Sequence, residues 1–238
     1  MAKVLLNSGG MDSMLLAHEP ELQGALHLFV DVGQTYVDKE RVASMEIAVS
    51  ANARWEEIKT ANLSAFEHPS GIIPFRNAEM ILCAAQYGTE IYLGVIADEI
   101  NSDKSVEFCY AMRNVLNISH RKQYWTEGKH FEVLTPYRLL SKTELVQRYL
   151  WKGNNLCNLL KSVSCYDAGD KHCGRCASCF KRWVALVNAL QYQDWAMWGF
   201  AKNPAEWKTY EQWEEIAVDY SFNRTKEILG ALHIALAL

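Results

Sequence analysis

A short glycine-containing loop near the start of the chain carries residue types suited to phosphate chemistry. Residues 8–13 read Ser-Gly-Gly-Met-Asp-Ser and directly follow a short apolar run. Two glycines let the backbone turn sharply and bring its N–H groups close to a ligand. A helix that starts in the loop adds about half a positive charge, and Ser8 and Ser13 add hydroxyl donors. The loop therefore predicts a phosphate site, with Mg²⁺ between the phosphate and Asp12.

This loop is not the P-loop of the common nucleoside triphosphatases, because it lacks the G-x-x-x-x-G-K-[ST] pattern. An ordinary strand–turn–helix junction, capped by a serine or an aspartate, is the alternative interpretation. The complete S-G-G-x-D-S pattern at the first such junction favours the phosphate site.

Four cysteines in the second half of the chain have the spacing of a metal centre. They are separated by 8, 3 and 3 positions and are Cys165, Cys173, Cys176 and Cys179. Two consecutive C-x-x-C steps suit tetrahedral Zn²⁺, and four protein ligands leave no open position, so the zinc would be structural. A redox C-x-x-C pair would explain only two of the four cysteines. His172 is an adjacent substitute ligand.

Composition indicates a globular, cytoplasmic protein. Half of the 238 residues are hydrophobic and 22% are charged, which excludes a disordered chain. No apolar run approaches the ~20 residues of a membrane helix, and the first residues form too short an apolar stretch for a signal peptide. The formal net charge is −4. Since nucleic-acid binding usually accompanies a basic balance, a nucleic acid is not the expected partner.

Short apolar runs alternate with helical patterns over the first 150 residues. The expected strands are residues 4–6, 25–30, 55–59, 90–95 and 131–134, and helices are expected at 36–51, 77–87, 106–118 and 141–150. This alternation predicts an α/β fold with a doubly wound parallel sheet. The ligand crevice of such a sheet lies beyond the carboxyl ends of its strands. The loops after the first, second and fourth strands are therefore the expected site.

The pattern changes after about residue 152. We expect an α/β domain over residues 1–152, followed by a zinc-binding segment and a Trp-rich helical tail over residues 153–238. Six of the eight tryptophans lie at or beyond residue 151. The aromatic tail is expected to pack on its own domain, and a homodimer contact or a substrate lid is the alternative.

Several motifs, taken together, resemble one family. The S-G-G-x-D-S loop is followed by Gly33-Gln34 after the second strand, by Pro74-Phe75-Arg76-Asn77, and by Thr135-Pro136 before residues 141–144. The cysteine segment reads S-C-Y, then C-G-x-C-x-x-C-x-x-R. The order and spacing over residues 3–186 resemble the 7-cyano-7-deazaguanine synthases, which are QueC-type ATP pyrophosphatases with an adenine nucleotide α-hydrolase-like fold.

The resemblance implies a reaction and its residues. ATP adenylates the carboxylate of 7-carboxy-7-deazaguanine, ammonia displaces AMP to give an amide, and a second ATP converts the amide to the nitrile. The implied nucleotide- and Mg²⁺-binding residues are Ser8, Gly9, Gly10, Asp12, Ser13, Gly33 and Gln34. The implied catalytic residues are Asp12, Ser13, Arg76 and Lys142. Magnesium and the cations would neutralise the departing pyrophosphate.

The substrate loop departs from the family pattern. Ile96 replaces the family's asparagine, and residues 96–105 are about two residues shorter than the family segment. Asp98 and Asp103 are the nearest candidates to read a guanine-like edge, with Lys104 facing the carboxylate. A changed set of polar groups changes what a pocket binds. The alternatives are an amide-only synthase, a different carboxylate, or a substrate on a protein or nucleic acid.

Two alternative hypotheses assign the chain to other functional classes. A tRNA-thiolating enzyme would need a sulfur-carrying cysteine, for which Cys83, Cys109 and Cys157 are the candidates. A tRNA-binding zinc-ribbon module would need no intact phosphate loop, and the complete loop argues against it.

Overall fold

A five-stranded parallel sheet forms the centre of the described structure. The computed structural model describes residues 2–68, 73–97, 102–167, 169–208, 212 and 222–236. Its strands are β1 (Lys3–Leu6), β2 (Leu26–Asp31), β3 (Trp55–Lys59), β4 (Glu90–Tyr92) and β5 (Glu132–Leu134). They lie in the order β3-β2-β1-β4-β5, and every neighbouring pair is parallel. The doubly wound sheet predicted from the sequence is confirmed.

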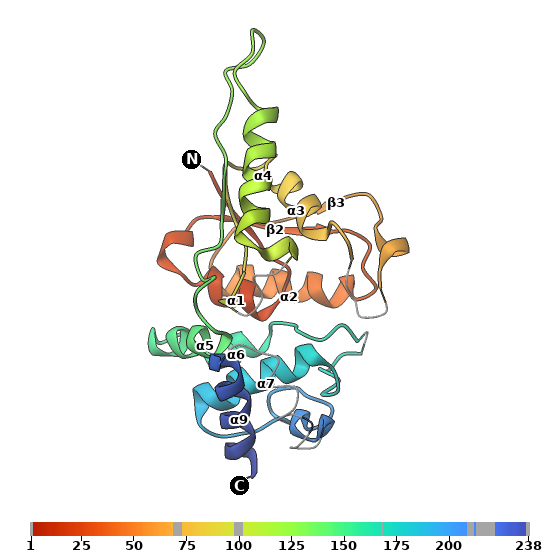
Figure 1. Ribbon diagram of the computed structural model, residues 1–238, viewed down its shortest axis with the longest axis vertical. Coiled ribbons are helices and arrows are strands. Elements are labelled where there is room, and N and C mark those ends of the chain that lie inside the picture. The colour runs from red at the N-terminus through yellow and green to blue at the C-terminus, as the bar shows by residue number, and fades with distance from the viewer. Residues whose placement is uncertain are drawn as a thin grey trace.

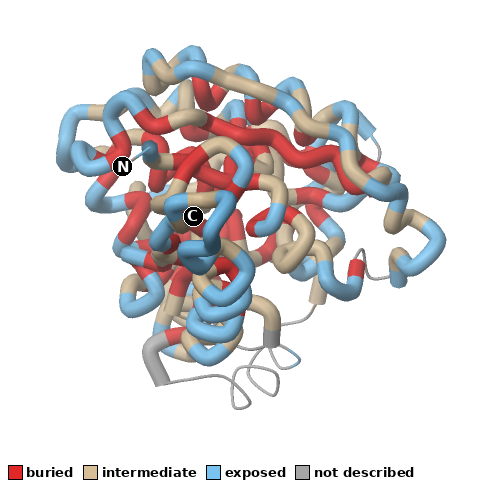
Figure 2. The backbone as a smooth tube through the Cα atoms, turned by 90° about the horizontal axis from the view of Figure 1, so that it is seen from above, coloured by how far each residue is buried: buried red, intermediate tan, exposed pale blue. Residues whose placement is uncertain are grey.

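Helices cover both faces of this sheet (Figure 1). On one face lie α3 (Arg76–Ala84) and α4 (Val106–Ser119), whose Ile81 and Leu116 pack against the strands. On the other lie α1 (Met11–Ala17), α2 (Val37–Ser50) and α5 (Lys142–Trp151), with Ile47 and Leu145 in the core. The central strands are buried on both sides (Figure 2), which explains their almost wholly apolar sequences.

Local signals set the ends of several elements. Ser141 accepts a hydrogen bond from the backbone N–H of Glu144, whose side chain accepts one from the backbone N–H of Ser141. This capping box, predicted from the spacing, starts α5 at Lys142. The strand expected to reach residue 95 ends at Tyr92. Beyond it, Gly94 runs so close to the phosphate loop that an added Cβ would lie 3.1 Å from the Cβ of Asp12.

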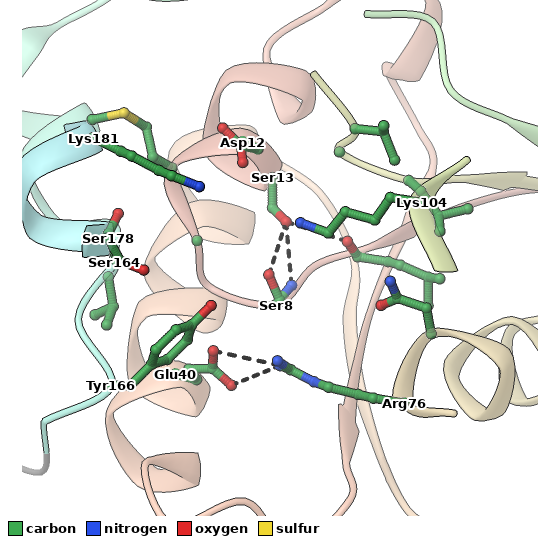
Figure 3. A pocket seen from close by; sticks show the side chains of 18 of the residues that line it. Ser8, Asp12, Ser13, Glu40, Arg76, Lys104, Ser164, Tyr166, Ser178 and Lys181 are labelled. Carbon is green, nitrogen blue, oxygen red and sulfur yellow. Dashed lines mark hydrogen bonds and ion pairs between the residues drawn. The ribbon is translucent and has the colours of Figure 1, made fainter. Parts of the chain in front are cut away.

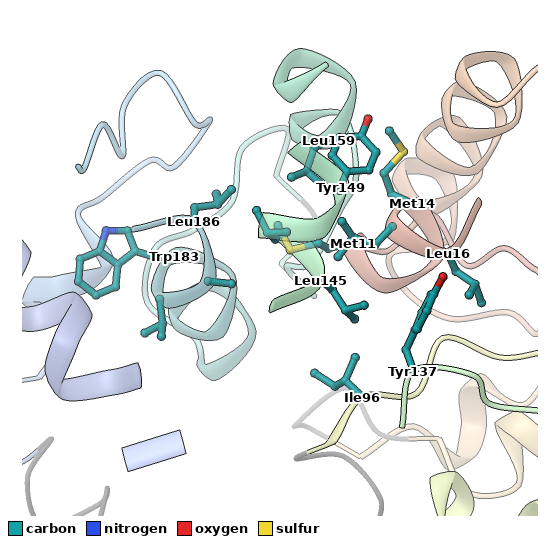
Figure 4. Close-up of a cluster of buried hydrophobic side chains, with 14 of the residues drawn as sticks. Met11, Met14, Leu16, Ile96, Tyr137, Leu145, Tyr149, Leu159, Trp183 and Leu186 are labelled. Carbon is teal, nitrogen blue, oxygen red and sulfur yellow. The ribbon is translucent and has the colours of Figure 1, made fainter. Parts of the chain in front are cut away.

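The C-terminal half packs beneath α1, α2 and α5 as a helical layer. It comprises α6 (Leu156–Leu160), α7 (Ala177–Leu190) and α9 (Phe222–Leu236). Helix α7 contacts α5 on one side and α9 on the other. Figure 4 shows the shared core, where Met11 of α1 and Leu145 of α5 lie together beside α7, and Trp183 points from α7 to the opposite side, towards the C-terminal part of the chain. The apolar stripes of the two halves therefore bury each other.

The described tryptophans of the tail are covered by this chain. Trp198 is buried, and Trp195 and Trp207 pack against the same core. The tail also holds the short 3₁₀ turn η5 (Pro204–Trp207). Trp213, Tyr210 and Tyr220 lie outside the described residues. No helix in the described part of the chain has the length and apolar character that crossing a membrane requires.

Candidate active site and metal centre

A pocket of about 170 Å³ opens at the carboxyl ends of β1 and β4. Two of the three loops predicted to form the site supply its floor, the phosphate loop and the segment that follows β4. The loop after the second strand contributes indirectly, through Glu40 of α2. Four cations line the pocket against two carboxylates: Arg76, Lys104, Lys142 and Lys181 against Asp12 and Glu40. On a chain with a net charge of −4, this pocket is locally suited to an anion.

The phosphate loop has the geometry expected of an anion cradle. Gly9 has a φ of +74°, and Gly10 stands at the N-cap of α1. The backbone N–H of Ser8 donates to Ser13 Oγ, and the two hydroxyl oxygens lie 3.3 Å apart (Figure 3). Ser8, Gly10 and Ser13 line the pocket. The loop therefore presents a helix N-terminus and two hydroxyls to whatever occupies it.

Asp12 and Lys142 meet across 130 positions of the chain. The Lys142 ammonium lies 2.9 Å from Asp12 Oδ1 and 3.1 Å from Oδ2. Both side chains are mostly buried but reach the pocket. Lys142 is the first residue of α5 and directly follows the N-cap Ser141. The capping box therefore fixes the backbone position from which the Lys142 side chain extends. The two residues expected from separate motifs thus form one ion pair.

A second ion pair lies at the other end of the pocket. The Arg76 guanidinium approaches the Glu40 carboxylate at 3.1 Å (Figure 3), and it also lies over the Tyr36 ring, 5.9 Å from the ring centroid. Burial raises the pKa of Glu40, against the effect of the facing arginine. Burial alone would lower the pKa of Arg76, but the carboxylate more than compensates, so the guanidinium stays charged. Glu40 is a site residue that the sequence analysis passed over.

Removing one member of this buried pair is expected to be costly. In an Arg76→Ala variant the Glu40 carboxylate would remain in the interior without its cation, so the free energy of unfolding should fall by about 3–5 kcal/mol. Urea unfolding measures this. The control is Lys122→Ala, which breaks the exposed pair with Glu127 and should cost below about 1 kcal/mol. Equal losses in the two variants would contradict the prediction.

Four of the expected binding residues that the structure describes do not line the pocket. Gly9 packs against α2 instead, where an added Cβ would lie 2.4 Å from the carbonyl oxygen of Glu40. Gln34 is buried behind the pocket, where its side-chain amide donates to Glu40 Oε2 at 2.8 Å. Gly33 packs against Asn62 and its N–H donates to Asp31. The backbone carbonyl of Asp103 accepts a hydrogen bond from Asn77.

Of the other residues in the predicted substrate loop, one lines the pocket and one does not. Lys104 does line the pocket, in the short turn η4 (Ser102–Lys104). Ile96 is buried in the core and offers the pocket no polar group. Asp98 lies outside the described residues.

The cysteine segment contributes to the pocket as well as to the metal centre. Ser164, Tyr166, Ser178 and Lys181 line it, and Figure 3 shows Lys181 directed towards the phosphate loop. None of the four was predicted to be a site residue. Two signals were present: Ser164 and Tyr166 belong to the S-C-Y motif, and Ser178 and Lys181 are three apart on one helix face beside Cys179.

Arg182, the arginine that ends the C-G-x-C-x-x-C-x-x-R segment, is buried. Its guanidinium donates to Ser162 Oγ at 2.8 Å and to the carbonyls of Leu159 and Leu160. Burial lowers the pKa of Arg182 to about 10, so it stays protonated at neutral pH. Arg182 therefore joins α7 to the end of α6.

The four cysteines gather at the start of α7, where they could hold a metal ion. Their sulfurs all lie within 4.8 Å of one another. Cys173 and Cys179 Sγ are 3.8 Å apart, about the separation that two Zn–S bonds of ~2.3 Å give at a tetrahedral angle. Backbone N–H groups donate to three of the four sulfurs, those of Cys165, Cys173 and Cys176. These features fit Zn²⁺.

His172 is excluded as a fifth candidate ligand through Nε2. That nitrogen accepts the backbone N–H of Ser164 at 3.1 Å. Its ring also packs against Phe200. Through its hydrogen bond with Ser164, His172 instead stabilises the loop segment that contains Cys165.

The fold and site define an α/β protein with a phosphate-type loop at the sheet edge and a four-cysteine metal centre. A sequence model described as queuosine biosynthesis protein QueC matches residues 30–190. A 7-cyano-7-deazaguanine synthase of Methanosphaerula palustris is 30% identical over 79% of this chain and 95% of its own length. The synthase of Synechococcus elongatus is 30% identical over 82% and 95%, and that of Chlorobaculum tepidum 28% identical over 79% and 92%. The chain belongs to the QueC family of queuosine biosynthesis proteins.

Proposed function

We propose that this protein converts 7-carboxy-7-deazaguanine and ammonia into 7-cyano-7-deazaguanine at the expense of ATP. The observation that carries the proposal is the convergence of the Ser8–Ser13 loop, the Asp12–Lys142 pair and Lys181 in one pocket. Relatives that align over most of this chain bear the name of that synthase. The substrates are small molecules, and the reaction takes place in the cytoplasm.

The pocket supports a binding mode for the ATP phosphates. The Ser8 and Ser13 hydroxyls and the N-terminus of α1 would hold phosphate oxygens. Lys142, Lys104 and Lys181 surround that point and would neutralise the charge of the leaving pyrophosphate. Asp12 would hold Mg²⁺, because a carboxylate beside a phosphate site is a ligand that Mg²⁺ prefers. Bound Mg²⁺ supplies Lewis-acid stabilisation of the phosphate charge.

The reaction then proceeds by adenylation. The substrate carboxylate attacks the α-phosphorus, the bond to the bridging oxygen breaks, and pyrophosphate leaves with the electron pair. Ammonia adds to the acyl carbon of the acyl-adenylate, a proton is lost, and AMP departs to give the amide. A second ATP adenylates the amide oxygen, and loss of AMP and protons leaves the nitrile. Adenylation makes a good leaving group from a poor one at each stage.

The cysteine positions favour this reaction over sulfur transfer. Cys83 and Cys109 lie in the α3 and α4 core, where burial raises the pKa of Cys83 to about 11 and also raises that of Cys109. Cys157 is exposed but does not line the pocket. In the described part of the chain, the pocket-lining cysteine is Cys165, which belongs to the metal centre. A persulfide-carrying thiol close to the loop is therefore not among the described residues.

Mass spectrometry of the reaction products tests the proposal. Zinc-loaded protein is incubated with ATP, Mg²⁺, ammonium and 7-carboxy-7-deazaguanine, and the nitrile is the expected product. Accumulation of the amide would restrict the function to the first half of the reaction. Absence of both products, together with absent ATP–pyrophosphate exchange, would overturn the assignment of this carboxylate.

Lys142→Ala is expected to lower the rate of substrate-dependent ATP–pyrophosphate exchange by about 100-fold or more. The reason is that one buried cation beside the leaving pyrophosphate is lost, an effect on the scale of an oxyanion-hole donor. Lys129→Ala removes an exposed lysine and is the matched control, with an exchange rate equal to the wild type. An active Lys142→Ala variant would remove this lysine from the mechanism.

A further inference from the structure

The C-terminal helix α9 lies outside the residues matched by the family model, yet it packs directly behind the candidate ATP site. Its apolar stripe of Ile228, Ala231 and Leu232 is buried against α7. The Asn188 side chain of α7 donates to the backbone carbonyl of Glu227 at 2.8 Å. These contacts fix the rotation of α9 about its own axis and its position along α7. The polar residues on the same side of α9 are therefore held in defined places.

Two of these polar residues, Arg224 and Glu227, line a small cavity together with Lys142 and Lys181. The same two lysines also line the phosphate pocket, so they separate one cavity from the other. Arg224 is only 8% exposed. The two lysines thus approach the phosphate pocket from one side and α9 from the other.

Glu227 acts on Lys142 through the helix cap. The Ser141 hydroxyl donates its proton to Glu227 Oε1 at 2.5 Å. Because a hydroxyl has a single proton, this bond leaves the serine oxygen as the acceptor for the backbone N–H of Glu144 at 3.2 Å. Ser141 immediately precedes Lys142, whose ammonium reaches Asp12. A carboxylate on α9 therefore orients the cap from which the candidate catalytic lysine extends.

The charges of the cluster point to a polyanionic ligand. Lys142, Lys181 and Arg224 gather around Glu227 on the α9 side, and Asp12 pairs with Lys142 on the side of the phosphate loop. Because Lys142 and Lys181 also line the phosphate pocket, their ammonium groups are placed to meet the phosphates of a nucleotide. Within ATP, the β- and γ-phosphates carry the density of negative charge that such a cluster would accept.

We propose that Arg224 and Glu227 are positioning residues that hold Lys142 and Lys181 against the pyrophosphate portion of ATP. The inference rests on the proposed ATP site, and it makes the C-terminal helix a part of that site. In this arrangement the cluster would contact the β- and γ-phosphates and not the adenosine and α-phosphate portion. The two residues therefore affect the affinity for pyrophosphate and leave that for AMP unchanged.

Titration calorimetry with MgATP, inorganic pyrophosphate with Mg²⁺, and AMP tests the inference on the zinc-loaded full chain. Arg224→Gln and Glu227→Ala should each weaken pyrophosphate and ATP binding about tenfold or more and leave AMP binding unchanged. Glu227→Gln keeps an acceptor for Ser141 and should restore most of the affinity. Lys226→Ala removes an exposed charge from the same helix and is the control. Melting temperature and zinc content are measured for every variant.

The outcomes separate this inference from the proposed function. Pyrophosphate affinity equal to the wild type in both variants would overturn the inference, as would a parallel fall in pyrophosphate and AMP affinity with a lowered melting temperature. A wild-type protein that binds neither ATP nor pyrophosphate would overturn it as well. If the wild type binds both but shows no exchange with 7-carboxy-7-deazaguanine, the proposed carboxylate is wrong, and the calorimetry still decides the role of α9.

Discussion

A Gly9→Ala variant is expected to have an affinity for ATP about 100-fold or more below that of the wild type. It is also expected to be less stable. Gly9 has a φ of +74°, where an L-residue costs about 1–2 kcal/mol. In addition, the new Cβ would lie 2.4 Å from the backbone carbonyl oxygen of Glu40 and 3.1 Å from the Cβ of Ala43. The loop must therefore move away from α2. That movement displaces the Ser8 hydroxyl and the loop N–H groups that define the phosphate site.

The chain contains a matched control for this substitution. Gly24 has nearly the same backbone angle, a φ of +76°, but an added Cβ meets nothing within 4 Å. Gly24→Ala therefore carries the conformational strain without the clash, so a loss of about 1–2 kcal/mol with unchanged ATP affinity is expected. Thermal unfolding and calorimetric titration with MgATP measure the two quantities. Similar ATP affinities of the two variants would mean that the loop does not bind the phosphates.

Loss of the metal centre is expected to have the second large effect. Cys179 is fully buried in the first turn of α7, and Cys176 is the N-cap of that helix. We expect the wild type to hold about one zinc ion per chain and a Cys179→Ser variant to hold none. Zinc in small structural sites contributes about 10–16 kcal/mol to folding, so the first turn of α7 should unfold. Ser178 and Lys181 would then leave the pocket, and ATP–pyrophosphate exchange should vanish.

Zinc content by elemental analysis, helix content by circular dichroism and the exchange rate test this prediction together. Cys157→Ser is the control, because Cys157 is exposed and remote from the other four cysteines. It should match the wild type in all three measurements. Removal of zinc from the wild type by a chelator should reproduce the Cys179→Ser result. An active, folded Cys179→Ser protein would limit the centre to a minor structural role.

Signals within short stretches of sequence were sufficient for the sheet, the phosphate loop and the metal ligands. The strand expected at residues 55–59 is β3 without any shift, and the capping-box spacing of Ser141 and Glu144 starts α5 where expected. The cysteines at positions 165–179 bring their sulfurs together within one short segment of the chain. Each of these features depends on backbone preferences or ligand spacing over a few residues, and such local patterns can be recognised in the sequence itself.

Tertiary packing alone decided which other side chains reach the pocket. Helical periodicity marks an apolar face on α7 and α9, but it does not say which helix that face meets. The docking of α7 against α5 is what brings Lys181 beside Lys142 and buries Arg182, and the docking of α9 brings Glu227 to Ser141. Gln34, by contrast, donates to Glu40 only six positions further along the chain, and does not enter the pocket. Contacts between residues tens of positions apart depend on the complementarity of whole surfaces, and no local pattern encodes that complementarity.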